Sequence, residues 1–136
     1  MESEWSYQRI YEMVLDKMIE QGENIPSVNG GYNYRVGDIV SPLGLFVPLD
    51  LFDEPDEDGE YVFKVDQRWL WDRPGMEGVK PFHILIEMLE RAYLDVDNYI
   101  AWMIEFAQDW NDQWYGWRAT ADYIHVPDRA RNFLIL

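Results

Sequence analysis

The stretch Pro81–Gly116, PFHILIEMLERAYLDVDNYIAWMIEFAQDWNDQWYG, decides the fold. Its apolar residues recur at steps of three and four, the period of a helix face. We predict one helix from that proline to about Leu94, and a second that Asp95 or Asp97 caps and Gly116 stops. Because only two or three residues join them, we expect antiparallel neighbours. The expected apolar faces are Phe82, Leu85, Ile86, Leu89 and Tyr93 in the first helix, and Ile100, Met103, Ile104, Ala107, Trp110 and Trp114 in the second.

A third helix is expected near the N-terminus, ending at about Glu20. Ser3 or Ser6 can cap it, because a serine hydroxyl accepts from the free amides of a first turn. Gly22 can adopt the left-handed conformation that ends a helix. The apolar face of this helix is predicted to be Tyr7, Ile10, Tyr11, Val14 and Met18.

The other segments predict little regular structure. From Tyr34 to Phe52, proline and glycine interrupt the apolar runs, so we expect only short strands or extended pieces. Alternating apolar and polar residues predict a short strand over Tyr61–Asp66 and an edge strand over Tyr123–Val126. Trp69–Lys80 is predicted to be irregular, and Phe133–Leu136 to form an apolar end. The expected fold class is α+β, with three principal helices and a small irregular β component, in a single domain over residues 1–136.

Charge is the strongest feature of the composition. The chain has 26 acidic and 11 basic residues and a net charge of -15. Such a field repels nucleic-acid backbones and anionic membranes and attracts basic surfaces, so we expect no direct DNA or RNA binding and no membrane partner. Acidity that only maintains solubility is the alternative. An N-terminus unlike a signal peptide, no cysteine and no run of about 20 apolar residues lead us to expect a cytoplasmic location.

Carboxylates crowd the loop from Asp50 to Glu60. A calcium loop of the EF-hand type needs glycine at its sixth position and a bidentate glutamate at its twelfth. With Gly59 at the sixth position, the twelfth is Val65. We therefore expect no calcium site, and interpret the loop as a solvated or partner-facing surface. Its candidate partner-binding residues are Asp53, Glu54, Asp56, Glu57, Asp58 and Glu60.

Motifs for catalysis or metal binding are weak. His83 and Glu87 are four apart on an expected helix, but two ligands do not complete a metal site, and His125 is remote in sequence. The chain has no cysteine, no Gly-x-Ser-x-Gly elbow, no P-loop and no dinucleotide fingerprint. We therefore expect no catalytic residue, no metal and no cofactor. A carbohydrate-active enzyme would instead pair carboxylates with tryptophans that stack on sugars. The tryptophans in question are Trp69 and Trp71, or Trp110, Trp114 and Trp117.

One row of carboxylates fits the net charge better. Glu105, Asp109 and Asp112 have helical spacing, on a face that diverges from the apolar stripe. Carboxylates one helical turn apart are separated by about 5–6 Å, a spacing comparable with that of phosphates along a DNA strand. Such a row can occupy a basic groove built for nucleic acid, although a merely solvated face has the same pattern.

Four short motifs occur in a characteristic order: Ile10–Gly22, which ends in Gln-Gly, then Tyr34–Gly37, Gly44–Asp50 and Leu85–Tyr93. In this order they resemble a group of small proteins common in tailed phages and their hosts, from which this chain differs by having no cysteine. The resemblance implies a phage origin, and hence the host cytoplasm. The group has no established activity, so the resemblance assigns no catalytic residue.

These observations lead to a non-enzymatic hypothesis. We expect an acidic phage-type protein that binds a basic host protein, in its most pointed form a DNA-mimicking inhibitor of a nucleic-acid-binding defence complex of the anti-CRISPR or anti-restriction type. Two alternatives stay open. A small carbohydrate-active enzyme predicts a concave, tryptophan-lined cleft with two facing carboxyls. A phage structural or assembly protein predicts an exposed apolar patch and self-association.

Overall fold

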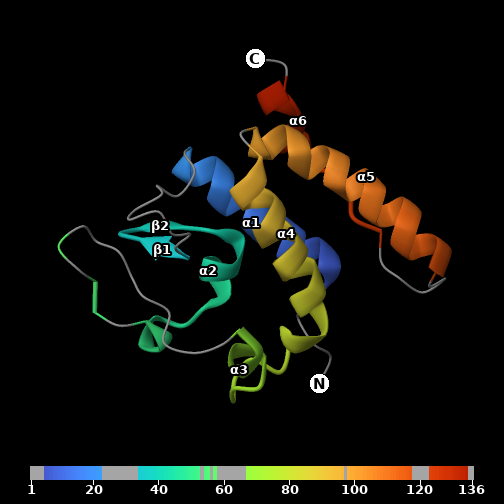
Figure 1. Ribbon diagram of the computed structural model, residues 1–136. Coiled ribbons are helices and arrows are strands. Elements are labelled where there is room, and N and C mark those ends of the chain that lie inside the picture. The colour runs from blue at the N-terminus through green and yellow to red at the C-terminus, as the bar shows by residue number, and fades with distance from the viewer. Residues whose placement is uncertain are drawn as a thin grey trace.

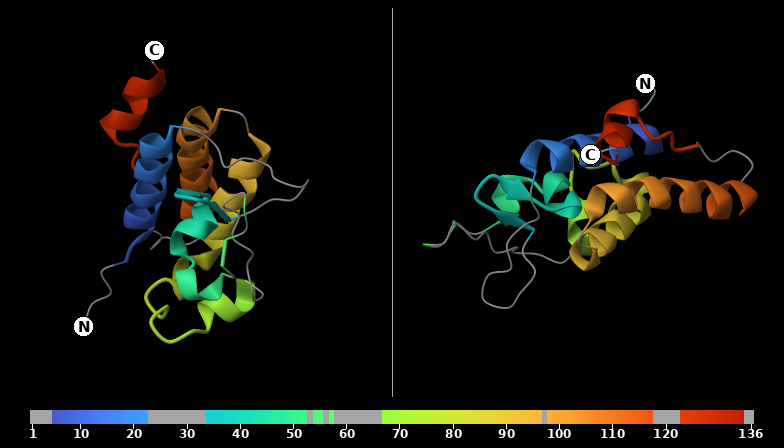
Figure 2. Two further views of the ribbon diagram at one scale, coloured as in Figure 1. Left: turned by 90° about the vertical axis from the view of Figure 1, so that its left-hand side faces the viewer. Right: turned by 90° about the horizontal axis from the view of Figure 1, so that it is seen from above.

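Three long helices dominate the computed structural model, which describes residues 5–22, 34–52, 54–55, 57, 67–96, 98–117 and 123–134. They are α1 (Tyr7–Gln21), α4 (His83–Asp95) and α5 (Tyr99–Trp117). In Figure 1, α4 passes in front of α1, and α5 starts beside the end of α4 and runs away from it. Seen from above in Figure 2, α1 lies behind α4 and α5, and the small β hairpin and the C-terminal end of α5 are at opposite ends of the molecule.

Helix α1 has the ends that the sequence predicts. The Ser6 hydroxyl accepts from the amide of Arg9 at 3.1 Å, and Gly22 ends the helix with a φ of 71°. The amide of Gly22 donates to the carbonyl of Met18 at 3.1 Å. The buried face is Ile10, Tyr11, Val14, Leu15 and Met18.

Helices α4 and α5 are confirmed, with different boundaries. Lys80–Phe82 forms a 3-10 turn (η2), so α4 begins at His83, and it ends at Asp95. Of the predicted caps of α5, Asp95 is instead the last residue of α4, and Asp97 lies outside the described residues. The Asn98 side chain accepts from the amide of Ala101 at 3.3 Å, in the first turn of α5. The helix also continues through Gly116 to Trp117, since one glycine inside a helix costs only about 1 kcal/mol.

The segment after α1 is more helical than expected. Two short strands, β1 (Arg35–Val36) and β2 (Ile39–Val40), form an antiparallel hairpin that pairs Arg35 with Val40 and Val36 with Ile39. The extended conformation predicted beyond it is wrong, because α2 (Pro42–Phe46) and the 3-10 turn η1 (Leu49–Leu51) follow. Ser41 caps α2, and Pro42 occupies the first turn, where proline is tolerated.

Gly44 allows α2 to pack against the hairpin. A Cβ at this position would lie 1.9 Å from the carbonyl oxygen of Tyr34, closer than any van der Waals contact permits. That carbonyl accepts from the amide of Ser41 at 3.1 Å, so it is fixed in place. A glycine is therefore required where the helix meets the backbone of the hairpin.

Two further short helices differ from expectation. The region predicted to be irregular begins in α3 (Gln67–Trp71), with turns following it. The chain end predicted to be merely apolar contains α6 (Asp128–Leu134). Tyr123–Val126 is not paired in a sheet among the described residues, and the predicted strand Tyr61–Asp66 lies outside them. The α+β prediction therefore holds in coarse form, as a mostly helical protein with one two-stranded sheet in the part of the chain described.

A single apolar cluster joins these elements. It includes the buried faces of the three long helices together with residues of α2 and α3. The buried hydroxyl of Tyr11 donates to the carbonyl of Met103 at 2.7 Å, which ties α1 to α5. Burial also raises the pKa of Tyr11 far above its usual value, so it stays a neutral donor. Within the described residues, no helix combines the length and apolar character needed to span a bilayer.

Candidate protein-binding surface

The predicted row of carboxylates lies on the outer side of α5. Glu105, Asp109 and Asp112 are all exposed, while Met103 and Trp110 of the same helix are buried. Since residues three and four apart are neighbours on a helix, the three carboxylates form one continuous acidic row. None of them forms an ion pair with a cation of the described residues.

Most of the described cations that have acidic partners lie away from this row. Arg73 binds both carboxylate oxygens of Asp50, at 3.2 and 2.8 Å, and Lys80 lies 2.8 Å from Asp72. The bond to Asp50 is the main reason that the pKa of Arg73 is raised.

A third such cation joins α6 to α1. Arg129 contacts Glu12 at 3.0 Å and also binds Asp16. These hydrogen bonds, the one to Asp16 first, raise the pKa of Arg129. The ion pairs thus neutralise carboxylates of α1 and of the segments around α3, and the charge of α5 stays uncompensated by them.

Beside the acidic row, aromatic side chains form a continuous wall along α5. The rings of Tyr99 and Trp102 are 5.7 Å apart, Trp102 and Phe106 are 4.8 Å apart, and Phe106 and Trp110 are 5.8 Å apart. Tyr7 of α1 continues the series, 5.4 Å from Trp110. Tyr99, Phe106 and Trp110 are buried, so most of this wall belongs to the core.

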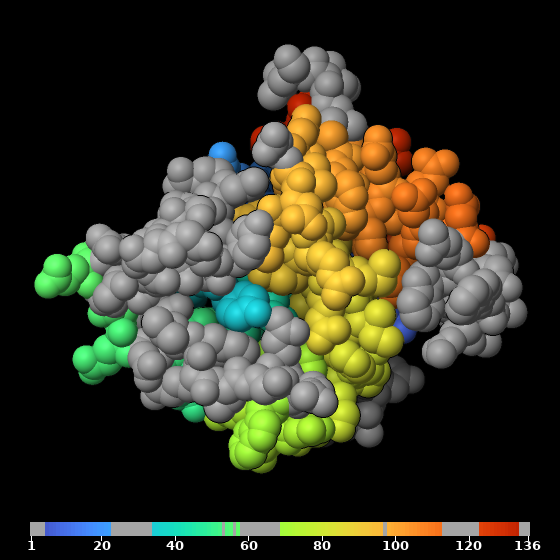
Figure 3. All heavy atoms as spheres, viewed as in Figure 1, coloured from blue at the N-terminus to red at the C-terminus, as the bar shows by residue number. Residues whose placement is uncertain are grey.

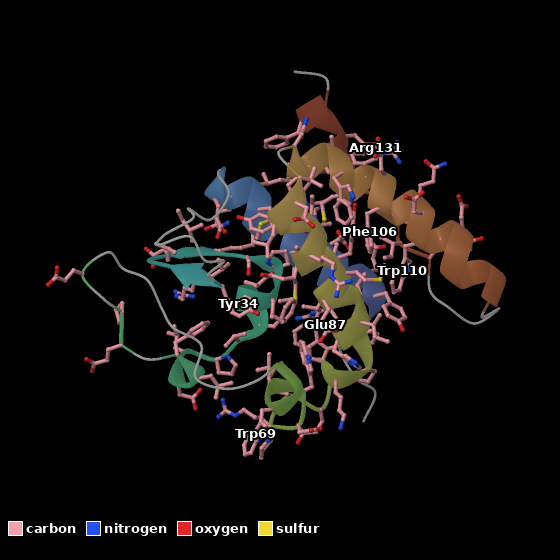
Figure 4. All side chains as sticks on the ribbon, viewed as in Figure 1. Tyr34, Trp69, Glu87, Phe106, Trp110 and Arg131 are labelled. Carbon is pink, nitrogen blue, oxygen red and sulfur yellow. The ribbon has the colours of Figure 1, made fainter. Side chains whose placement is uncertain are left out.

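An open groove of about 590 Å³ lies between α4 and two residues of this wall, Trp102 and Phe106. The two helices diverge from their short connection (Figure 1). Its apolar lining is Ile84, Met88, Ala92, Val96, Trp102 and Phe106, and its charged lining is Glu87, Arg91 and Asp95. Figure 3 shows the exposed side of α4 turned toward the viewer with α5 beside it, and Figure 4 shows Phe106 between the two helices.

The groove leaves apolar side chains accessible. Ile84 is 44% exposed and Met88 is 37% exposed, and one helical turn separates them on α4. Exposed apolar residues that are contiguous and surrounded by charge are typical of interaction sites, whereas scattered ones are ordinary. The sequence does not predict this groove, because it depends on how far α4 and α5 diverge.

The other predicted partner-binding residues lie in the acidic loop. Glu54 and Glu57 are exposed, whereas Asp53, Asp56, Asp58 and Glu60 lie outside the described residues, as does Val65. The structure therefore joins Glu105, Asp109 and Asp112 in one surface, and leaves the relation of the loop to that surface as a prediction.

The histidine and tryptophan candidates have ordinary structural surroundings. His83 lies 2.5 Å from the carbonyl oxygen of Lys80 through its Nδ1, and its ring contacts that of Trp71. The described residues contain no group of three or more His, Asp or Glu side chains that could hold a metal ion. Trp71 and Trp110 belong to the core, so they are not platforms for a sugar, while Trp69 is 67% exposed. The side chains of Trp114 and Trp117 lie outside the described residues.

Comparison with known proteins adds no assignment. No family model, no curated protein and no solved structure matches the chain. The chemistry of the surface itself is therefore the basis for inferring a function.

Proposed function

We propose that this protein binds a basic protein surface through the acidic row Glu105, Asp109 and Asp112, without catalysing a reaction. The observation that carries the proposal is that these exposed carboxylates have no cation partner among the described residues, while other carboxylates hold Arg73, Lys80 and Arg129. Unpaired charges of one sign steer a partner of opposite charge and select its orientation.

The narrower form of the proposal is DNA mimicry. The partner is then a nucleic-acid-binding host defence complex, and this chain is its phage-encoded inhibitor. Two features support it: the net charge of -15, and carboxylates that repeat about every helical turn, roughly 5–6 Å apart. A row of this kind presents charge to a basic groove in the way that a phosphate backbone does.

The test compares two charge-reversed variants. The first carries Glu105→Lys and Asp112→Lys. The matched control carries Glu20→Lys and Asp38→Lys, which are also exposed, lie on other elements and change the net charge equally. Each is used as bait in a bacterial lysate at low salt, and the captured protein is identified by mass spectrometry. We expect the first variant to lose the partner and the control to retain it.

Surface plasmon resonance with the captured partner then tests the mechanism. Affinity should fall as salt rises, because the Debye length shrinks from about 10 Å at 0.1 M to about 3 Å at 1 M. Reversal of the row should slow association more than it speeds dissociation. Duplex DNA should compete if the narrower form is correct. Binding that is insensitive to salt and equal in both variants would show that the acidic row is not the binding surface.

A further inference from the structure

The groove between α4 and α5 adds an apolar half to the acidic surface. Glu105 lies three positions after Trp102 on α5, and these two residues are neighbours on the helix surface. Asp109 has the same relation to Phe106. The acidic row therefore borders the aromatic wall of the groove on its solvent side.

The opposite wall of the groove combines apolar and charged side chains. Ile84 and Met88 of α4 supply exposed apolar surface, and Glu87 and Asp95 supply carboxylates among the lining residues. Arg91 is the single cation among the described residues of that lining. Apolar side chains thus lie between two borders that carry carboxylates, one on each helix, and the border on α4 also holds Arg91.

We infer that this groove binds an amphipathic, basic helix of a partner protein, an inference that depends on the proposed function for the sign of the partner's charge. Apolar residues at i, i+3, i+4 and i+7 of such a helix fit a groove of this kind, and lysine or arginine on its flanks meets the two carboxylate borders.

Charge decides between this occupant and a second copy of the same chain. Two copies would bring two molecules of net charge -15 together, with Glu87 and Asp95 lining the contact and the acidic row of α5 next to it. Like charges placed opposite each other at an interface cost several kcal/mol, so a basic partner is favoured.

The test uses a synthetic probe. An amphipathic peptide of leucine and lysine, about 18 residues long, is compared with a scrambled peptide of identical composition, whose leucines cannot form one stripe. Binding to the full chain is measured by isothermal titration calorimetry at low salt and located by the chemical shift of the Trp102 indole N–H. We expect the amphipathic peptide to bind at least tenfold more tightly than the scrambled one and to shift that indole signal.

Paired variants establish whether the groove is responsible. Ile84→Ser with Met88→Ser removes exposed apolar surface of the groove, and Leu49→Ser with Phe133→Ser removes a comparable amount elsewhere, from side chains 57% and 45% exposed. The groove variant should weaken binding of the amphipathic peptide about tenfold, given the apolar area lost. The control should change it less than twofold. Circular dichroism verifies that both variants fold.

The outcomes separate the groove from the proposed function. Equal binding of both peptides, lost with Glu105→Lys and Asp112→Lys but unaffected by the groove variant, would overturn the groove inference and leave the acidic row in place. Binding that depends on Ile84 and Met88 but is unaffected by salt and charge reversal would support the groove and overturn the role of the row. Failure of the amphipathic peptide to bind, or concentration-dependent dimerisation abolished by the groove variant, would overturn the inference.

Discussion

Glu90 is the one ionisable acid that is buried among the described residues, and its surroundings favour the neutral form. It is 5% exposed, and one carboxylate oxygen accepts from the amide of Leu43 at 2.7 Å, which fastens α4 to the start of α2. Its other oxygen has no hydrogen-bond partner among the described residues. Burial raises the pKa of Glu90 to about 7, against the opposing effects of the bonds from Leu43 and Ser41. Tyr99 lies close enough for the Glu90 charge to add to the effect of burial in raising the tyrosine pKa.

Stability should depend on pH through this residue. The folded state favours neutral Glu90, because the folded pKa lies above the ordinary value of 4.5. This stabilisation is fully present below about pH 4.5 and is lost as the pH rises through about 7. Glu90→Gln removes that ionisation. From pH 4 to pH 8 the wild type should therefore lose roughly 3 kcal/mol of stability through this group, and the variant should not. The free energy of unfolding of the variant, minus that of the wild type, should increase by the same amount. Urea denaturation at several pH values measures it, with exposed Glu20→Gln correcting for net charge. A difference that stays constant with pH would contradict this role.

At the scale of the elements, side-chain amides replace a strand partner for the segment before α6. Gln8 of α1 accepts from the amide of His125 at 2.6 Å and donates to its carbonyl at 2.8 Å. Asn111 of α5 does the same for Ile124, with both distances 2.9 Å. Two side-chain amides thus satisfy the backbone N–H and C=O groups of two consecutive residues. This segment, predicted as an edge strand, therefore needs no partner strand at these residues.

Asn111→Asp should destabilise the fold by about 1–3 kcal/mol, because a carboxylate keeps the acceptor for Ile124 but leaves the Ile124 carbonyl without its donor. The matched control is Asn132→Asp, the same change at an exposed position of α6. Chemical denaturation gives the free energies of unfolding, and hydrogen exchange at Ile124 reports the local effect. Equal loss of stability in the two variants would mean that net charge, rather than the amide pair, is responsible.

The elements also show what the sequence can reveal. Helices α1, α4 and α5 were predictable because their apolar period is local and long. Helix α2 was missed because its proline indicates an interruption, although Ser41 and Pro42 together start a helix. The pairing of Gln8 with His125 spans 117 positions, so no local pattern contains it. The exposed row on α5 was predictable because its spacing is local. The groove beside it was not, because it depends on how α4 and α5 lie relative to each other.

Over the whole molecule, two electrostatic effects oppose each other. The net charge of -15 produces self-repulsion, which destabilises a compact state. The ion pairs of Arg73, Lys80 and Arg129 stabilise it, but each involves exposed side chains. Exposed pairs contribute roughly 0–1 kcal/mol each. Repulsion should therefore outweigh the ion pairs.

Raising sodium chloride from 0.05 to 0.5 M should consequently raise the Tm. The rise should be steepest at low salt, because the Debye length is already about 10 Å at 0.1 M, so much of the repulsion between surface charges is screened there. Calorimetry over the salt series measures this, and the variant with Glu105→Lys and Asp112→Lys should show a smaller rise, since its repulsion is lower. A Tm that falls with salt would mean that the ion pairs dominate. The direction of the Tm change also matters for the binding experiment. If salt stabilises the fold while it weakens capture of the partner, unfolding cannot be the cause of the lost affinity. The loss of affinity is then due to the charged surface of α5.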